Sequence, residues 1–108
     1  MVLRTTLQEL GHEVTEAVNG QEALEKLHGQ GPFDLAMVDW NMPVMTGIEF
    51  VVRLRTEKAY DAMKVIMVTT EVEIAQVDRA LKAGVNEYVM KPFTKEMIQE
   101  KIEMVAAA

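Results

Sequence analysis

Three polar residues far apart in the sequence could together receive a phosphoryl group: Asp39, Thr69 and Lys91. A carboxylate can attack phosphorus to form an acyl phosphate, and a cation and hydrogen-bond donors must stabilise the charge on the transferring oxygens. Asp39 would be the nucleophile, Lys91 the cation and Thr69 the donor. Taken singly, each residue also has an ordinary structural explanation, because Asp often begins a turn, Thr often lies beside a helix cap, and Lys before Pro is usually a solvated loop charge.

Short apolar runs lead up to these three residues and have the pattern of buried strands. The runs Asp34–Asp39 and Lys64–Thr69 are bounded by turn residues, which is typical of strands that a parallel sheet covers on both faces. A third run, Glu87–Met90, ends at Lys91, and Glu13–Ala17 is a further strand candidate. We therefore expect about four strands in one sheet.

Helices are predicted before, between and after these strands. The spacing of Val2, Leu3, Leu7 and Leu10 predicts the first, which ends near Gly11. Helix starts are marked by pairs at capping-box spacing, namely Asn19 with Glu22, Thr46 with Glu49, and Thr70 with Glu73, and by Thr94 before the last helix. Five helices alternating with strands imply right-handed crossovers and a doubly wound parallel α/β sandwich. Ligands of such folds bind beyond the carboxyl ends of the strands, where Asp39, Thr69 and Lys91 are predicted to lie.

Composition excludes several other classes of protein. The chain has 108 residues, which we expect to form one domain, with 17 acidic and 11 basic side chains, a net charge of −6 and no Cys. Disulfides and thiolate metal sites are therefore excluded. The negative charge gives no footprint for nucleic acid. The longest apolar runs are far shorter than the ~20 residues that span a bilayer, so we expect a cytoplasmic protein without a membrane partner.

Three segments resemble the receiver domain of two-component response regulators, closest to the stand-alone chemotaxis type. They are Asp39–Gly47, with the pattern D-x-x-M-P-x-M-x-G, Val68–Glu71, and Tyr88–Thr94, which contains K-P-F. The resemblance runs from the first helix to the last. It implies a flavodoxin-like fold and a signalling protein rather than an enzyme. It also implies that a sensor histidine kinase phosphorylates Asp39 and that the surface around Val72 to Lys101 contacts a downstream protein target.

The resemblance also implies roles at the phosphoryl site. Thr69 and Lys91 would contact the phosphoryl group, and Tyr88 would change rotamer as Thr69 moves. Asn41 would offer its backbone carbonyl to a Mg²⁺ ion that Asp39 also binds. A plain alternative for Tyr88 is a core position.

Loop residues complete the set that the resemblance implies. Pro43 and Gly47 would shape the loop after Asp39, and the Lys91-Pro92 bond would be cis. Pro43 and Gly47 are also ordinary loop residues, so their presence alone decides little.

One expected element has no counterpart in the sequence. Receivers begin with an apolar strand that ends in a Mg²⁺-binding acidic pair, and that strand lies between the ones expected at Glu13–Ala17 and Asp34–Val38. We therefore expect a truncated sheet, weak Mg²⁺ binding and impaired phosphorylation. Three arrangements stay open: the flanking strands close up, two copies pair or exchange elements in a homodimer, which we favour, or the segment belongs to the natural chain.

Two other functions stay open as alternatives. A degenerate receiver could act as an interaction module without phosphorylation, which the lack of an acidic pair favours and the presence of Asp39, Thr69 and Lys91 opposes. A small hydrolase could use Asp39 as its nucleophile. Such phosphatases carry D-x-D, and Asn41 stands where their general acid would be, so this function ranks last.

Overall fold

The structure is a computed structural model that describes residues 2–30, 33–39, 45–69 and 74–107. Within these residues five α-helices, one short 3-10 helix and three strands alternate along the chain, as expected of an α/β fold. They are α1 (Val2–Glu9), α2 (Gly20–Gln30), β1 (Leu35–Asp39), α3 (Gly47–Arg55), η1 (Lys58–Tyr60), β2 (Lys64–Thr69), α4 (Ile74–Ala83), β3 (Glu87–Met90) and α5 (Lys95–Ala107).

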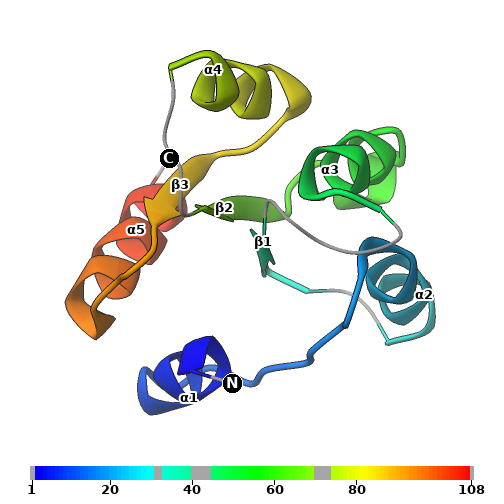
Figure 1. The fold of residues 1–108 in the computed structure, drawn as a ribbon. Coiled ribbons are helices and arrows are strands. Elements are labelled where there is room, and N and C mark those ends of the chain that lie inside the picture. Colours follow the sequence, from blue (N-terminus) through cyan, green and yellow to red (C-terminus); the bar gives the residue numbers. More distant parts are fainter. Residues whose placement is uncertain (1, 31–32, 40–44, 70–73, 108) are drawn as a thin grey trace.

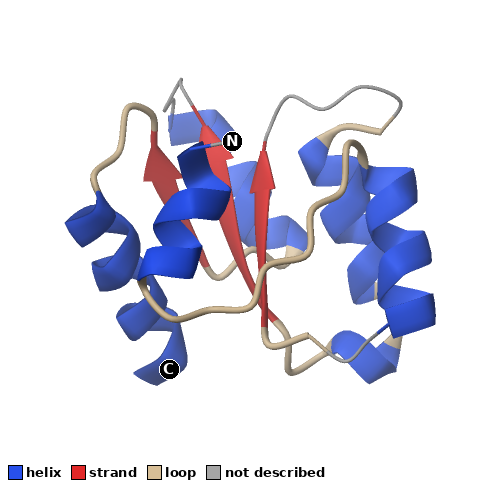
Figure 2. Ribbon diagram, turned by 90° about the horizontal axis from the view of Figure 1, so that it is seen from below, coloured by secondary structure: helices blue, strands red, loops and turns tan. Residues whose placement is uncertain are grey.

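The three strands form one parallel sheet in the order β1-β2-β3. Leu35 pairs with Lys64 at the start of β1, and Thr69 pairs with Met90 at the end of β2 and β3. The helices cover both faces, with α1 and α5 on one side and α2, α3 and α4 on the other (Figure 1). The strand arrows all point the same way, so their carboxyl ends meet at one edge of the sheet (Figure 2). The doubly wound parallel architecture is confirmed.

The strand predicted at Glu13–Ala17 is wrong. Residues 12–17 belong to no strand, and the sheet has three strands instead of four among the described residues. The segment joins α1 to α2 and runs apart from β1 (Figure 1). The reason is that a strand exists through its ladder with a neighbour, and among the described residues no backbone donor or acceptor pairs with the main chain of residues 13–17. An apolar pattern alone does not provide that neighbour.

Two apolar cores lie on the two faces of the sheet, and β2 contributes to both. The core under α2, α3 and α4 includes Val65 and Met67 of β2 together with Leu54 of α3. The core under α1 and α5 includes Ile66 of β2 and Ile98 of α5. All five of these side chains are completely buried. Burial of successive β2 residues toward opposite faces is what the nearly continuous apolar run in the sequence predicts.

Helix caps follow the sequence patterns with one difference. The Glu49 backbone N–H donates to Thr46 Oγ1 at 3.2 Å, and Glu49 Oε1 accepts from the Thr46 backbone N–H at 3.1 Å, which completes the predicted capping box. Asn19 Oδ1 accepts from the backbone N–H of Glu22, whose carboxylate accepts from the N–H of Val18 instead of Asn19. Thr94 caps α5 as predicted, whereas the pair Thr70 and Glu73 lies outside the described residues.

Replacement of Thr46 with Ala is expected to lower the free energy of unfolding by about 1 kcal/mol, because the first turn of α3 loses its side-chain acceptor. Urea denaturation measures the change. Thr15→Ala, at an exposed position outside any helix, is the control and should leave the midpoint nearly unchanged. Equal midpoints for both variants would show that the cap contributes nothing.

Glu49 should make stability depend on acid pH. Hydrogen bonds from the backbone of Thr46, and then from its side chain, lower the pKa of the Glu49 carboxyl below its ordinary value of 4.5. A lowered folded-state pKa adds stability above the unfolded-state value, and that stability is lost as the pH falls through the folded-state value. Denaturation of the wild type and of Glu49→Gln is therefore expected to differ at neutral pH and to converge below pH 4.5. A constant difference across this range would contradict the assignment.

The guanidinium group of Arg55 holds the turn that precedes β3. Arg55, at the end of α3, donates from Nε and Nη2 to the carbonyl of Gly84 and from Nη1 to the carbonyl of Tyr60. Gly84 ends α4 with a φ of +113°, and a Cβ there would come within 2.7 Å of the Arg55 side chain. Burial lowers the pKa of Arg55, while Asp61 raises it. These hydrogen bonds connect α3 to the turn between α4 and β3.

Candidate functional site

The carboxyl ends of the three strands bring the predicted residues into one region. Asp39 is the last residue of β1, Thr69 is the last of β2, and Lys91 directly follows β3. Because the strands are parallel and adjacent, these ends lie at the same edge of the sheet. We call Asp39, Thr69 and Lys91 the strand-end site.

Lys91 holds the site together through two contacts. Its Nζ lies 2.7 Å from Asp39 Oδ2, in an ion pair whose side chains are 36% and 41% exposed. Its backbone N–H donates to the Thr69 carbonyl at 2.7 Å. The ammonium group therefore reaches across the whole sheet, from beyond β3 to the end of β1. A partly exposed carboxylate beside a fixed cation can receive an anionic group from solvent.

Thr69 differs from the other two residues in its burial. Only 6% of its surface is exposed, whereas the side chains of Asp39 and Lys91 are open to solvent by more than a third. It belongs to the most deeply buried strand, in which every residue after Lys64 is buried. Because Thr69 is buried, a change in its position would be transmitted to the packing around it.

Tyr88 lies two residues before the end of β3 and packs partly buried against the core of α2, α3 and α4. The ammonium of Lys101, on α5, lies 5.4 Å from the centre of the Tyr88 ring, and it also lies 3.5 Å from Glu87 Oε1. Tyr88 thus joins the core to the surface between β3 and α5. The contact of Lys101 with Tyr88 could not be predicted from the sequence, because no local pattern links a helix residue to a strand residue thirteen positions earlier.

Of the predicted loop residues, Gly47 and Pro92 lie in the described part of the chain. Gly47 is the buried first residue of α3, and the Lys91-Pro92 peptide bond is cis, as the resemblance implied. Asn41 and Pro43 lie outside the described residues. The predicted roles of Asn41 in metal binding and of Pro43 in the loop therefore stay predictions.

The described residues do not make a magnesium site on their own. Mg²⁺ prefers several oxygen ligands in octahedral geometry. Across the described ranges no group of three or more His, Asp or Glu side chains comes together, and Asp39 is the one carboxylate of the strand-end site. Its Oδ2 is already paired with Lys91. One carboxylate in contact with a cation does not fit a dedicated Mg²⁺ site.

A comparison with protein-family models shows to which family the chain belongs. The family model of the response regulator receiver domain matches residues 1–103, which is nearly the whole chain. The chain belongs to the response regulator receiver domain family. This receiver domain is therefore a module of two-component signal transduction, as the three sequence segments and the parallel fold indicated.

Relatives of this receiver domain include chemotaxis regulators. A chemotaxis protein CheY homolog of Campylobacter jejuni is 48% identical over 105 residues, which cover 96% of this chain and 81% of the relative. The solved structure of the chemotaxis protein CheY4 of Vibrio cholerae is 36% identical, with a TM-score of 0.90 over 96% of this chain and 86% of that one. These two relatives support a chemotaxis-like receiver.

A second solved structure shares the fold of this chain. The receiver domain of the Pseudomonas aeruginosa sensor histidine kinase PA1611 has a TM-score of 0.88 over 99% of this chain and 87% of that one. It is described with a magnesium ion coordinated in its active-site cleft. At 23% identity the likeness concerns the fold.

Membrane insertion finds no support in the described helices, since none combines the length and the apolar character that a bilayer span requires.

Proposed function

We propose that this receiver domain accepts a phosphoryl group on Asp39 from a sensor histidine kinase and passes the signal to a protein target by contact. The observation that carries the proposal is the 2.7 Å pairing of Asp39 with Lys91 at the carboxyl ends of adjacent parallel strands. It combines a solvent-accessible nucleophile with a fixed cation. The protein acts in this proposal as a phosphoacceptor and not as an enzyme that turns over a separate substrate.

The proposed transfer forms one bond and breaks one bond. A carboxylate oxygen of Asp39 bonds to phosphorus while the phosphorus–nitrogen bond of a phosphohistidine breaks, and the imidazole leaves with the electron pair and takes up a proton. Lys91 Nζ, within 2.7 Å of the nucleophilic group, stabilises the charge of the transferring oxygens. Thr69 supplies a hydrogen-bond donor to the phosphoryl group in the product.

The proposed switch runs from Thr69 to Tyr88. Thr69 is the last residue of β2, and Tyr88 of β3 pairs in register with Met67 of β2. The pairing of β2 with β3 therefore links Thr69 to Tyr88. Movement of the Thr69 hydroxyl toward a phosphoryl group would change the packing available to the Tyr88 ring. Because that ring contacts Lys101 at the α5 surface, a change in its rotamer would alter the face that a protein target contacts.

Intact-protein mass after incubation with acetyl phosphate and Mg²⁺ tests the proposal. We expect a gain of one phosphoryl group, carried by the peptide that contains Asp39. Oligomeric state measured on the same sample shows whether a homodimer accompanies the reaction. A folded protein that gains no phosphoryl group would support an interaction module that works without phosphorylation, and turnover of a phosphomonoester would support a hydrolase.

Magnesium binding is expected to be weak. Mutation of a residue that only hydrogen-bonds to a metal ligand typically reduces metal affinity by roughly 10–100-fold. A site with one described carboxylate should therefore bind Mg²⁺ at least roughly tenfold more weakly than a receiver with an acidic pair does. The fluorescence of Trp40, the one tryptophan in the sequence and the neighbour of Asp39, provides the signal. The Campylobacter jejuni homolog serves as the reference protein. Equal affinities in parallel titrations would contradict the prediction and would point to further ligands.

A further inference from the structure

The ammonium group of Lys101 lies between a carboxylate and an aromatic ring, and we infer that Lys101 and Glu87 together hold the Tyr88 ring in its position and oppose its change of rotamer. Lys101 Nζ lies 5.4 Å from the centre of the Tyr88 ring and 3.5 Å from Glu87 Oε1. We call these three residues the ring clamp. Its consequence for signalling rests on the proposed function, whereas its effect on the ring itself does not.

The register of β3 places the two strand residues of the ring clamp on opposite faces of the sheet. Glu87 pairs with Ile66, which belongs to the core under α1 and α5, and Tyr88 pairs with Met67, which belongs to the core under α2, α3 and α4. Successive strand residues alternate between the faces. Lys101 comes from α5, on the Glu87 face (Figure 1). Its ammonium group therefore reaches past β3, an edge strand of the described sheet, to a ring on the other face.

Glu87 fixes the cation relative to the ring. Its Oε1 accepts a hydrogen bond from the Tyr88 backbone N–H at 3.0 Å and also pairs with Lys101 Nζ. The carboxylate is thus held against the backbone of the same residue whose ring the ammonium contacts. A lysine side chain by itself is flexible and strongly hydrated, so it has little reason to stay over one ring. The carboxylate supplies that reason.

The low exposure of this ion pair strengthens both contacts. The side chains of Lys101 and Glu87 are 26% and 19% exposed, less than those of every other ion pair between described residues. Partly buried pairs are screened much less than surface pairs. A cation within about 6 Å of a tyrosine ring is attracted by the ring face, and more strongly where water is excluded. A change of rotamer takes the ring away from the cation, so the ring clamp opposes that change.

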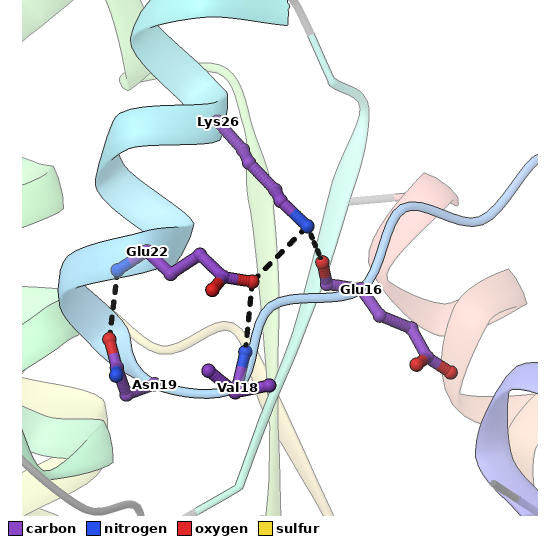
Figure 3. A network of polar contacts seen from close by, with 5 residues as sticks. All are labelled: Glu16, Val18, Asn19, Glu22 and Lys26. Carbon is purple, nitrogen blue, oxygen red and sulfur yellow. Dashed lines mark hydrogen bonds and ion pairs between the residues drawn. The ribbon is translucent and has the colours of Figure 1, made fainter.

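A second carboxylate makes the same two kinds of contact without a ring. Glu22 Oε1 accepts from the Val18 backbone N–H and lies 3.2 Å from Lys26 Nζ (Figure 3). Here the ammonium also contacts the carbonyl of Glu16, and no aromatic side chain belongs to the network (Figure 3). Both side chains of this pair are more exposed than those of the ring clamp. Glu22→Gln is therefore a matched control, since it removes an equivalent charge far from Tyr88.

The ring clamp would set how much of the protein signals without phosphorylation. In the proposed function, Tyr88 changes rotamer when Thr69 moves toward a phosphoryl group on Asp39. Glu87 and Lys101 act on the same ring from the α5 side, and neither belongs to the strand-end site. They are positioning residues that stabilise the ring position seen here. A restraint of this kind lowers the population of the alternative ring position in the unphosphorylated protein.

NMR of the Tyr88 side chain tests the inference without a phosphodonor. Three-bond couplings from the ring Cγ to the backbone give the rotamer, and relaxation dispersion gives the population of a minor ring position. Glu87→Gln keeps an acceptor for the Tyr88 N–H but loses the charge, and Lys101→Met keeps the length of the side chain but loses the cation. We expect each to raise the population of the second position by roughly two- to fivefold. Tyr60, the other tyrosine of the chain, is the internal reference and should not change.

The control variant and a phosphodonor separate the possible outcomes. Urea denaturation first establishes that each variant is folded. An unchanged Tyr88 population in either Glu87→Gln or Lys101→Met would overturn the inference, because the ring clamp needs both charges. An equal change in Glu22→Gln would overturn it as well. Addition of acetyl phosphate and Mg²⁺ to the wild type tests the switch separately: couplings that stay constant while the mass shows a bound phosphoryl group would contradict the proposed switch and leave the ring clamp supported by the two variants.

Discussion

Replacement of Asp39 with Asn is expected to abolish phosphate incorporation from acetyl phosphate, as measured by intact-protein mass. Asn has nearly the shape of Asp, but its amide lacks the negative charge and the nucleophilic oxygen that form an acyl phosphate. The position lies at the end of β1 and is partly exposed, so the core is not altered. The loss should therefore reflect chemistry and not unfolding.

Asp34→Asn provides the matched control for this result. Asp34 directly precedes the other end of β1, and its side chain is exposed. We expect the control to incorporate phosphate as the wild type does. In Asp39→Asn, Lys91 loses an ion-pair partner that is 41% exposed, and a pair so open to solvent contributes less than about 1 kcal/mol to stability. Incorporation that persists in Asp39→Asn would place the acceptor at another residue.

Replacement of Leu54 with Ala is expected to destabilise the protein by about 2–5 kcal/mol, because it leaves a cavity in a completely buried part of the core. Leu54 lies on α3 and packs in the core that covers the Val65 and Met67 face of β2. Since small domains have only about 5–15 kcal/mol of stability in total, this single change removes a large part of it. The free energy of unfolding from urea denaturation measures the effect.

Val52→Ala, two residues earlier on the same helix, is the control for Leu54→Ala. The Val52 side chain is 49% exposed, and substitutions at such surface positions usually change stability by no more than about 0.5 kcal/mol. A loss at Leu54 no larger than the loss at Val52 would mean that the α3 face repacks freely and that this core is not closely packed.

The elements that carry the strand-end site could be predicted because their signals are local. Lys64–Thr69 and Glu87–Met90 agree residue for residue with β2 and β3, since nearly continuous apolar runs between turn residues have few alternatives in a parallel sheet. Thr46 and Glu49 form the capping box that their spacing predicts. Parallel pairing then places Asp39, Thr69 and Lys91 at one edge without further information.

Features that depend on distant partners could not be predicted in the same way. Glu13–Ala17 has a short apolar pattern, but it has no neighbouring strand among the described residues, so its backbone forms no ladder there. The contacts of Arg55 with Gly84 and of Lys101 with Tyr88 join residues from different elements, and no spacing rule relates them. The roles assigned to Thr69, Tyr88 and Asn41 rest on family resemblance and stay predictions.

The position of β2 in the sheet also constrains how the chain folds. β2 is the central strand, and it meets β1 only across α3 and β3 only across α4. None of the three described strands is joined to another by a hairpin, so the first pairing among them must close a loop that contains a whole helix. Non-local closure of this kind slows folding relative to helical proteins of similar size. We therefore expect the rate-limiting step to be the docking of a preformed helix–strand unit onto β2, to which α3 or α4 connects it.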